Sequence, residues 1–559
     1  MFPLKFIASA YQAKQLDANN EITQTASDYL VPALMLFLAT FALYGKALGH
    51  DFLDNWDDDL YVTGNKDILG FTLEHIKNAF TRNYFGNYAP MHIISYMLDY
   101  SLWGLNATAF KLTNILLHAL NVVLYYVILV RITGRRQLSL AAAAIFLCHP
   151  VQVESVVWIS QRKNVLAMFF FLISFMMYLN WKQYRTRLYY VISLAAFVLA
   201  LLTKSVVVIL PLILICYDLC FEERNSFWEQ VRNKLPYVVL AVACAVVAFY
   251  TQETGGRTPY LGGSPYVMML NMLPVFSNYL ILLFAPFQLN IIYNAPVKTV
   301  VDAEILLPAL LFVILMLSLI YLFRRHRGLF FWGFLFLVGL LPVSNIIPIV
   351  TLMNDRYLYF PMLGFAAFIA HLPFIDQDTF SKRRIAALRM LFAVALVALS
   401  VVTWKRIDVW QDSLTLWGDA VANAQEGTWY DTDKNFISKG YAAELVRRGL
   451  QAERVNNLVK ASDYYQRALM YNPSSLTALN NLGCLAMKQG NVMAGRRYFI
   501  LLTENFQHFD EGFLNLGQNY FLTGDLDKAE YNLRRSLTIS PSNSLASKLL
   551  NEIDKKRGK

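Results

Sequence analysis

The chain has 559 residues, of which 56% are hydrophobic, and its mean hydropathy is +0.39. This apolar content excludes an ordinary soluble globule and predicts a polytopic membrane protein. The net charge of +10 does not indicate a nucleic-acid partner, because Lys and Arg concentrate in short loops between apolar segments, as topology selection produces. Four of the five cysteines lie in apolar stretches and the fifth stands alone, so neither a disulfide framework nor a thiolate metal site is indicated.

Eleven apolar segments are long enough to cross a hydrocarbon core, which takes about 17–25 residues. They cover residues 29–48, 108–130, 138–158, 163–181, 187–203, 205–221, 235–251, 305–323, 329–347, 357–374 and 386–403. A twelfth segment, 267–285, is ambiguous. Residues 1–28, before the first apolar segment, carry mixed charge, and no small-residue cleavage site follows that segment. We therefore expect a cytoplasmic N-terminal segment and a first helix that is retained as an anchor.

Basic loops predict the orientation of these segments. Such loops follow the second, fourth, sixth, eighth and tenth segments, which places them in the cytoplasm. The loop after the first segment then lies outside, together with Arg162-Lys163, Lys204 and Asn354-Asp355-Arg356. The same parity forbids a single crossing at 267–285, and nearby prolines favour a re-entrant or interfacial segment, or pairing with another short crossing.

The most polar stretch, Asp54 to Tyr61 (DNWDDDLY), directly follows the first apolar segment. Charged groups beside a bilayer are costly to desolvate, so their presence indicates a functional role such as catalysis or ion binding. Adjacent carboxylates cannot both ionise cheaply, so one has a raised pKa suited to proton transfer, or a cation compensates them. We interpret this acidic loop as the source of a general base or a metal ligand; the alternative is a solvated turn.

A second polar stretch runs from His149 through Glu154 to Arg162-Lys163. If a helix continued through it, Glu154 and Arg162 would share one face, since their spacing is a multiple of four. Arg162 and Lys163 would suit an anionic phosphate. Interfacial snorkelling of two basic residues is the alternative.

Three more positions carry polar groups to the same side. Lys204 interrupts two apolar runs, and Arg356 could bind phosphate oxygens with its two-pronged guanidinium. The alternatives are a helical hairpin at Lys204 and an ion pair of Arg356 with Asp355 or an acidic-loop residue. Residues 83–92 combine aromatics with amides, which is typical of a sugar platform and equally of an interfacial aromatic belt.

The tail beyond residue 406 is polar and repetitive. Asn481-Leu482-Gly483 recurs as Asn515-Leu516-Gly517, one period of 34 residues later. This period, with small residues where paired helices approach, predicts tetratricopeptide repeats. Residues 441–474 form a degenerate first repeat, so we expect a repeat domain at 441–559 after a linker at 407–440. Such repeats offer a concave surface for a peptide.

Taken together, these motifs resemble the transmembrane and tetratricopeptide-repeat-containing O-mannosyltransferases and their bacterial relatives. The resemblance rests on Asn55 to Val62, Tyr88-Ala89-Pro90, Leu112 to Asn121, His149 to Arg162, Thr203-Lys204, Leu341 to Asn345 and Asp355 to Tyr359. It implies an all-α protein in which a GT-C-like transmembrane catalytic domain of about eleven helices, residues 29–406 with an outer loop at 49–107, precedes the repeat solenoid. The implied activity is inverting transfer of a sugar from a polyprenyl-phosphate-linked donor to a hydroxyl acceptor on a protein.

The resemblance also implies roles for individual residues. It places the general base on the pair Asp57-Asp58, with Asp57 favoured. The residues expected at the donor phosphate are Arg162, Lys163, Lys204 and Arg356. Further candidates for contact with substrate are Asp59, Tyr88, His92, His149 and Glu154. Relatives often have Arg where this chain has Ala89, so Lys163 or His92 is expected to replace it. A divalent cation, Mg²⁺ or Mn²⁺ on Asp57, Asp58 and Asp59, is left open.

Two other functions fit parts of the pattern. A flippase of lipid-linked sugars would use carboxylates as proton relays. Such a protein is expected to carry functional charges near the bilayer midplane, whereas those of this chain gather at the outer ends of the segments. A membrane-anchored scaffold would leave the acidic loop unexplained. No nucleotide-phosphate loop is present in the sequence, which argues against an ATP-driven pump. Without an organelle address, the sequence favours a bacterial inner membrane with site and repeats on the periplasmic side.

Overall fold

The structure is a computed structural model that describes residues 27–222, 227–252, 258–293, 297–371, 382–424 and 436–558. Most of the expected N-terminal segment 1–28 therefore lies outside the described residues. Across these ranges the chain is helical, apart from loops and one two-residue bridge between Tyr84 and Asn87. It divides into two compact units, Met1–Leu416 and Trp417–Lys559. The all-α class predicted from the sequence is confirmed.

The first unit holds the apolar helices. They are α2 (Ser27–Tyr44), α5 (Ala107–Thr133), α6 (Arg136–Cys148), α8 (Arg162–Tyr184), α9 (Arg187–Leu201), α10 (Leu210–Phe221), α11 (Phe227–Gln252), α12 (Pro265–Phe284), α13 (Ala303–Arg325), α14 (Arg327–Leu340), α15 (Pro361–His371) and α16 (Lys382–Val409). Seven are long and apolar enough to span a membrane, a bent pair at 136–157 makes an eighth, and four are shorter. These twelve correspond to the eleven predicted segments and the ambiguous 267–285. The chain is a multi-pass membrane protein.

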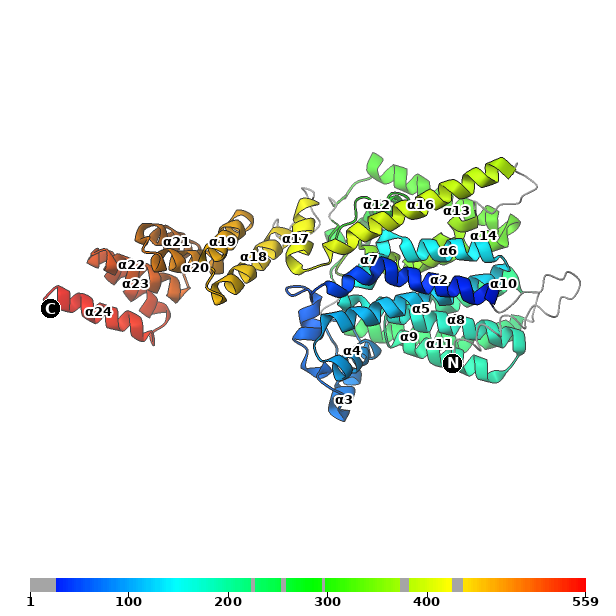
Figure 1. The fold of residues 1–559 in the computed structure, drawn as a ribbon, viewed down its shortest axis with the longest axis horizontal. Coiled ribbons are helices and arrows are strands. Elements are labelled where there is room, and N and C mark those ends of the chain that lie inside the picture. Colours follow the sequence, from blue (N-terminus) through cyan, green and yellow to red (C-terminus); the bar gives the residue numbers. More distant parts are fainter. Residues whose placement is uncertain are drawn as a thin grey trace, which may run out of the picture. The chain divides into compact units, whose positions relative to one another are not determined.

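The burial of these helices separates a core from a lipid-facing layer. The apolar windows of α5 and α8 are 61% and 78% buried, whereas those of α13 and α16 are 6% and 0% buried. Leu307, Leu310, Met390 and Leu391 are among the large apolar side chains that α13 and α16 leave exposed. A surface this apolar is stable in hydrocarbon rather than water. In Figure 1, α2, α5 and α8 lie side by side, and they pack against one another.

Helix α12 bears on the predicted topology. It runs unbroken from Pro265 to Phe284 with Pro274 inside, so the expected break at this proline is absent. Just before it, the Tyr260 hydroxyl donates to Ile346 O (3.2 Å), and near its end Leu283 O lies 3.0 Å from the ring of His149. Residues 346 and 149 both follow helices that end on the side of the acidic loop. Both flanks of α12 therefore contact segments at this end of the unit, and that 267–285 is not a single crossing stays a prediction.

The second unit consists of paired helices. They are α18 (Phe436–Arg454), α19 (Leu458–Tyr471), α20 (Leu476–Lys488), α21 (Val492–Asn505), α22 (Asp510–Leu522), α23 (Leu526–Ile539) and α24 (Ser544–Lys556). Helices α20, α22 and α24 begin at residues 476, 510 and 544, which reproduces the predicted 34-residue period. Neighbouring helices pack along the series (Figure 1). The expected linker 407–440 contains the end of α16, the helix α17 (Ser413–Ala422) and the start of α18.

The repeated glycines explain why the period is strict. A methyl group on Gly483 would lie 2.3 Å from the ring of Phe499, and one on Gly517 would lie 2.8 Å from Leu533. The two glycines stand one period apart, as do their neighbours. Each glycine therefore lets the two helices of a repeat approach closely.

We expect Gly483→Ala to destabilise the repeat unit by about 1–3 kcal/mol, because the added methyl group overpacks the contact with Phe499. The measurement is the free energy of unfolding of the full chain, followed by fluorescence. Thr477→Ala, at an exposed position of the same helix, is the matched control and should change little. Equal stability of the two variants would contradict the packing role of Gly483.

Candidate active site at the loop end of the membrane unit

The acidic loop lies at one end of the membrane unit, here called the loop end, which also holds residues 149–163, 204 and 354–356. Asp58 fixes the loop to this end. Its fully buried carboxylate accepts hydrogen bonds from Leu53 N (3.0 Å), Ser160 N (3.0 Å) and Ser160 Oγ (2.5 Å). Burial raises the pKa of Asp58, whereas the charge of Lys111 and these hydrogen bonds favour the ionised form. Asp58 is therefore a structural anchor.

Asp57 faces a different environment from its neighbour. It is half-buried, and it interacts electrostatically with Arg356. Asn55, two residues earlier, adopts a left-handed backbone conformation with φ of 60°, which asparagine tolerates better than most residues. The turn therefore directs the two adjacent carboxylates to separate partners. Asp57 is thus the partly exposed carboxylate of the pair, and the alternative of a simple solvated turn does not describe the buried Asp58.

The stretch from His149 to Arg162 is not one helix, so the expectation that Glu154 and Arg162 share a face is wrong. Helix α6 ends at Cys148, and the short α7 (Val153–Val157) follows a bend of 55°. Trp158 is extended, with φ −76° and ψ 119°, before α8 begins at Arg162. The break allows Glu154 and Arg162 to point toward different partners.

Arg162 is completely buried and fully engaged. It forms an ion pair with Asp99 (2.5 Å), and its Nε donates to Asn114 Oδ1 (2.9 Å). Its remaining groups donate to the carbonyls of Ser95 (3.1 Å) and Phe110 (2.8 Å). Burying an arginine is tolerable only with such complete pairing. In this structure Arg162 holds α4 (Pro90–Trp103), α5 and α8 together, with four of its five N–H groups directed at protein acceptors.

Arg356 is also paired, but it remains partly exposed. Its Nη1 lies 2.5 Å from Glu154 Oε1, and its backbone N donates to Glu154 Oε2 (2.7 Å). Its side chain is 16% exposed and lies over the ring of Trp158 at 5.5 Å. Glu154 therefore positions Arg356 beside Asp57. Arg356 thus forms an ion pair, but its partner is Glu154 and not Asp355 or an acidic-loop residue, which the alternative had named.

Two lysines complete a cationic cluster here. Lys204 donates to Asn164 Oδ1 and interacts electrostatically with Lys163 and Arg356. Lys163 lies 4.9 Å from the centre of the Tyr61 ring. Within the described residues, neither lysine forms an ion pair with a carboxylate. We refer to Lys163, Lys204 and Arg356 as the basic cluster.

The remaining candidates lie around this cluster or apart from it. The His92 ring is buried against Tyr96 (2.8 Å), and burial together with Lys163 lowers the pKa of His92 well below its usual value, so it is neutral. His149 caps the turn at Val151 and contacts Leu283 O. Tyr88 and Asp59 are half-buried, and within the described residues neither forms a hydrogen bond or an ion pair with the cluster. Which residue replaces the absent arginine at Ala89 stays a prediction, for which Lys163 is the charged candidate.

The carboxylates do not form a joint metal site. Asp58 is turned to Leu53 and Ser160, away from the side to which Asp57 faces. Among the described residues no group of three or more His, Cys, Asp and Glu side chains could hold a metal ion. The three adjacent aspartates therefore do not act as one ligand set in this structure.

Several residues of the site were not predicted. Asn164, which is 1% exposed, bridges Lys204 to the backbone of Arg356 (3.4 Å). Trp158 stacks on Trp410 at 5.5 Å between ring centres. Asn164 directly follows Arg162 and Lys163 in the sequence, and a polar residue next to two basic residues could have been predicted as part of the site. Trp410 comes from a distant part of the sequence, and no local pattern connects it with Trp158.

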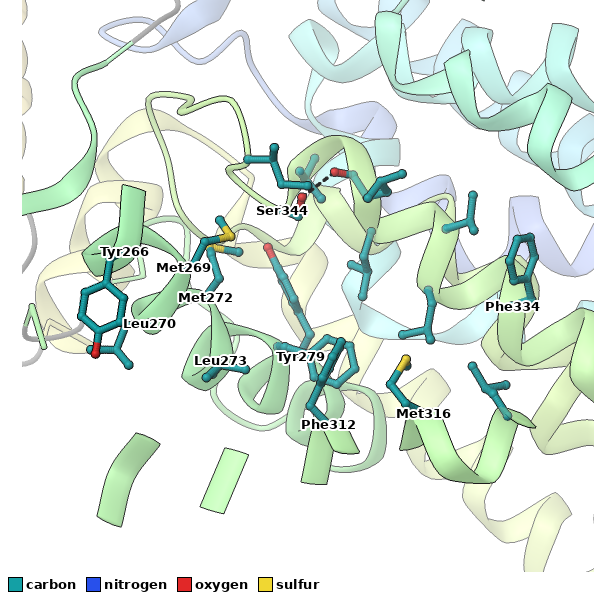
Figure 2. A pocket seen from close by; sticks show the side chains of 18 residues that line it. Tyr266, Met269, Leu270, Met272, Leu273, Tyr279, Phe312, Met316, Phe334 and Ser344 are labelled. Carbon is teal, nitrogen blue, oxygen red and sulfur yellow. Dashed lines mark hydrogen bonds between the residues drawn. The ribbon is translucent and has the colours of Figure 1, made fainter. Parts of the chain in front are cut away.

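An apolar cavity of about 730 Å³ adjoins the site. Helices α12, α13 and α14 line it with side chains such as Met269, Phe312 and Phe334, and Ser344 lies at its edge (Figure 2). Tyr279 lines this cavity, and its hydroxyl accepts a hydrogen bond from Asn354 N (3.3 Å). Since Asn354 is two residues from Arg356, the cavity and the basic cluster are neighbours. An amphiphile with an anionic head group could bind both.

We expect Asp58→Asn to lower the free energy of unfolding by about 3 kcal/mol, because it leaves the buried charge of Lys111 without its carboxylate. Asp57→Asn, at the adjacent half-buried position, should stay within about 1 kcal/mol of wild type. Unfolding in mixed detergent micelles measures both. A larger loss for Asp57→Asn than for Asp58→Asn would contradict the division of roles.

The buried Asp355 should make stability depend on pH. Burial raises its pKa to about 8, opposed by Arg406 and by the hydroxyl of Tyr293. The folded state then binds more protons than the unfolded state above a pH of about 4, so stability falls as the pH rises toward 8. Asp355→Asn should therefore gain thermal stability relative to wild type between about pH 5 and about pH 8. A difference in unfolding midpoint that is constant with pH would contradict this assignment.

Comparisons with known proteins agree with this arrangement. Residues 88–250 match the family described as dolichyl-phosphate-mannose-protein mannosyltransferase. The human protein O-mannosyl-transferase TMTC1 is 25% identical over 520 residues, which are 81% of this chain and 56% of that protein. The protein O-mannosyl-transferase F38B6.6 of Caenorhabditis elegans is 22% identical over 411 residues, covering 70% and 57%.

Among solved structures, ArnT from Cupriavidus metallidurans bound to undecaprenyl phosphate aligns with a TM-score of 0.37 at 15% identity, covering 85% of this chain and 80% of that one. The chain spans a little over half the length of the two curated relatives above. The resemblance expected from the motifs is confirmed: the chain is similar to the transmembrane and tetratricopeptide-repeat-containing protein O-mannosyltransferases.

Proposed function

We propose that the protein is a membrane glycosyltransferase that moves a sugar from a polyprenyl-phosphate-linked donor to a hydroxyl group of a protein acceptor. Likeness to protein O-mannosyl-transferases favours mannose as the sugar. The observation that carries the proposal is the basic cluster beside Asp57: two lysines without carboxylate partners, next to an arginine that Glu154 holds in place.

The charge of this cluster supports a phosphate ligand. Desolvating two ammonium groups without a counter-ion is unfavourable, so an anion that enters the site gains strongly from them. Glu154 acts on both Arg356 and Lys204, and Asp57 lies near Arg356, so two carboxylates face three cations. The phosphate diester of the donor carries one negative charge that would compensate the remainder, and the departing phosphate monoester gains further charge at the same place.

The apolar cavity supports a lipid carrier for this phosphate. A volume of about 730 Å³ lined by methionine, leucine and phenylalanine suits part of an isoprenoid chain. The contact between Tyr279 and Asn354 joins the cavity to the segment that carries Arg356. A polyprenyl phosphate would therefore place its chain among α12–α14 and its head group at the basic cluster.

The proposed reaction is a direct displacement. The acceptor oxygen attacks the anomeric carbon of the sugar while its proton passes to the carboxylate of Asp57. The bond between that carbon and the phosphate oxygen breaks, and the electron pair leaves with the polyprenyl phosphate. Lys163, Lys204 and Arg356 stabilise the negative charge that develops on the departing phosphate. Attack opposite to the leaving group inverts the anomeric configuration.

The position of the site in the membrane follows from charge. The basic loops at the other helix ends favour the cytoplasm, so the loop end faces away from it, on the periplasmic side in a bacterial inner membrane. The repeat unit follows the last membrane helix, and its paired helices are of the kind that bind peptides. We assign it the recruitment of the acceptor protein.

The test is transfer of labelled sugar from a polyprenyl-phosphate donor to protein, by the full chain in nanodiscs. We expect Asp57→Asn to lower kcat by about 100-fold or more, because proton transfer to a positioned base contributes at least that much. Lys163→Met and Lys204→Met should lower kcat/KM for the donor by roughly tenfold each, since each loses a charge-assisted contact. Lys66→Met, at an exposed lysine of the outer loop that carries Asp57, is the control and should transfer sugar as wild type does.

Two results would contradict the proposal. In the first, Asp57→Asn folds and transfers sugar at the wild-type rate. In the second, the wild-type protein moves the labelled lipid between leaflets without transferring sugar, which would establish the flippase in its place. Intact binding of partners by a transfer-deficient Asp57→Asn would argue against a mere scaffold.

A further inference from the structure

A second polar cavity, of about 320 Å³, lies far from the candidate active site. Helices α2, α5, α8 and α10 line it, together with Glu222. Arg131 follows Lys111 by twenty residues along α5, and Lys182 follows Lys163 by nineteen along α8. At about 1.5 Å per helical residue, each pair is separated by roughly 30 Å, the thickness of a hydrocarbon core. This cavity is therefore at the opposite membrane interface.

The cavity carries an uncompensated positive charge. Lys182 pairs with Glu222 (2.5 Å) and Asp218 (3.4 Å), and Lys234 also contacts Asp218. Together with Arg131, three cations thus face two carboxylates. The remaining charge belongs to Arg131, which pairs with no carboxylate among the described residues.

The hydrogen bonds of Arg131 turn it toward the cavity instead of the surface. It donates to Asn180 Oδ1, to Leu179 O (2.7 Å) and to Gln183 Oε1 (2.7 Å), all of them uncharged. These bonds leave its Nε–H and one Nη1–H without a protein acceptor in the described part of the chain. A snorkelling arginine would extend to water, whereas this one is tied to three groups of α8. Its free donors and its charge suit an anion.

We propose that this cavity binds the phosphate of a singly charged phosphate ester, as found in the head group of an anionic phospholipid. One negative charge matches the one excess positive charge. The guanidinium fork suits two phosphate oxygens, and the Tyr217 hydroxyl at the cavity wall offers a further contact. Val127, Val130 and Leu179 line the same cavity and would contact the apolar part of the lipid.

The test is binding of short-chain phosphatidylglycerol to the delipidated full chain in uncharged detergent, measured as the rise in the unfolding midpoint with ligand concentration. We expect Arg131→Gln to weaken this binding by tenfold or more, because a charge-assisted contact is lost. Arg325→Gln, at an exposed arginine ending α13, should bind as wild type does. Short-chain phosphatidylcholine, with no net charge, should stabilise the protein much less.

Glycerophosphoglycerol, the water-soluble head group of phosphatidylglycerol with the same singly charged phosphate diester, separates the two sources of the phosphate group. If it gives the same Arg131-dependent stabilisation as phosphatidylglycerol, the site stands and its ligand is water-soluble; if only the lipid does, the ligand is a head group. Wild-type affinity in Arg131→Gln, or equal binding of phosphatidylcholine, would overturn the proposal. Should Arg131→Gln not fold, Arg131→Lys keeps the charge but loses the fork, and it must then bind several-fold more weakly.

Discussion

The cost of burying charge beside a membrane controls the arrangement of the loop end. Arg162 is compensated by Asp99, Arg356 by Glu154, and Asp58 by Lys111 together with the donors of Ser160. Each pair joins segments that are far apart in the sequence, so the pairs that make burial tolerable also assemble the site. Lys163 and Lys204 form no ion pair within the described residues, and they lie together near Arg356, with which Asp57 interacts.

This division explains why neighbouring residues of the same type have different roles. Asp57 and Asp58 differ because the buried carboxylate of Asp58 fastens the loop to Leu53 and Ser160, whereas Asp57 stays half-buried near Arg356. Arg162 and Lys163 differ because the extended Trp158 interrupts the helix, which turns Arg162 into the packed helices and leaves Lys163 beside Tyr61. Contacts within the protein hold the basic cluster in place, as Glu154 does for Arg356 and Asn164 does for Lys204.

The sequence predicted the features that depend on composition and period. Apolar length located the membrane segments, and the 34-residue period located the paired helices of the repeats. The basic cluster was predicted residue by residue, except that Arg162 belongs to the framework in this structure. No local sequence pattern could predict partners that lie far apart in the chain. Examples are Asp99 for Arg162, Glu154 for Arg356 and Trp410 for Trp158. The bend after Cys148 was also missed, since the apolar pattern runs on across it.

The most direct test of the central claim is a structure of the full chain in nanodiscs with a polyprenyl phosphate bound. The account predicts the phosphate in contact with Lys163, Lys204 and Arg356, within reach of Asp57, and the isoprenoid chain in the cavity between α12 and α14. A phosphate bound elsewhere, with both lysines unengaged and that cavity empty of lipid, would contradict it.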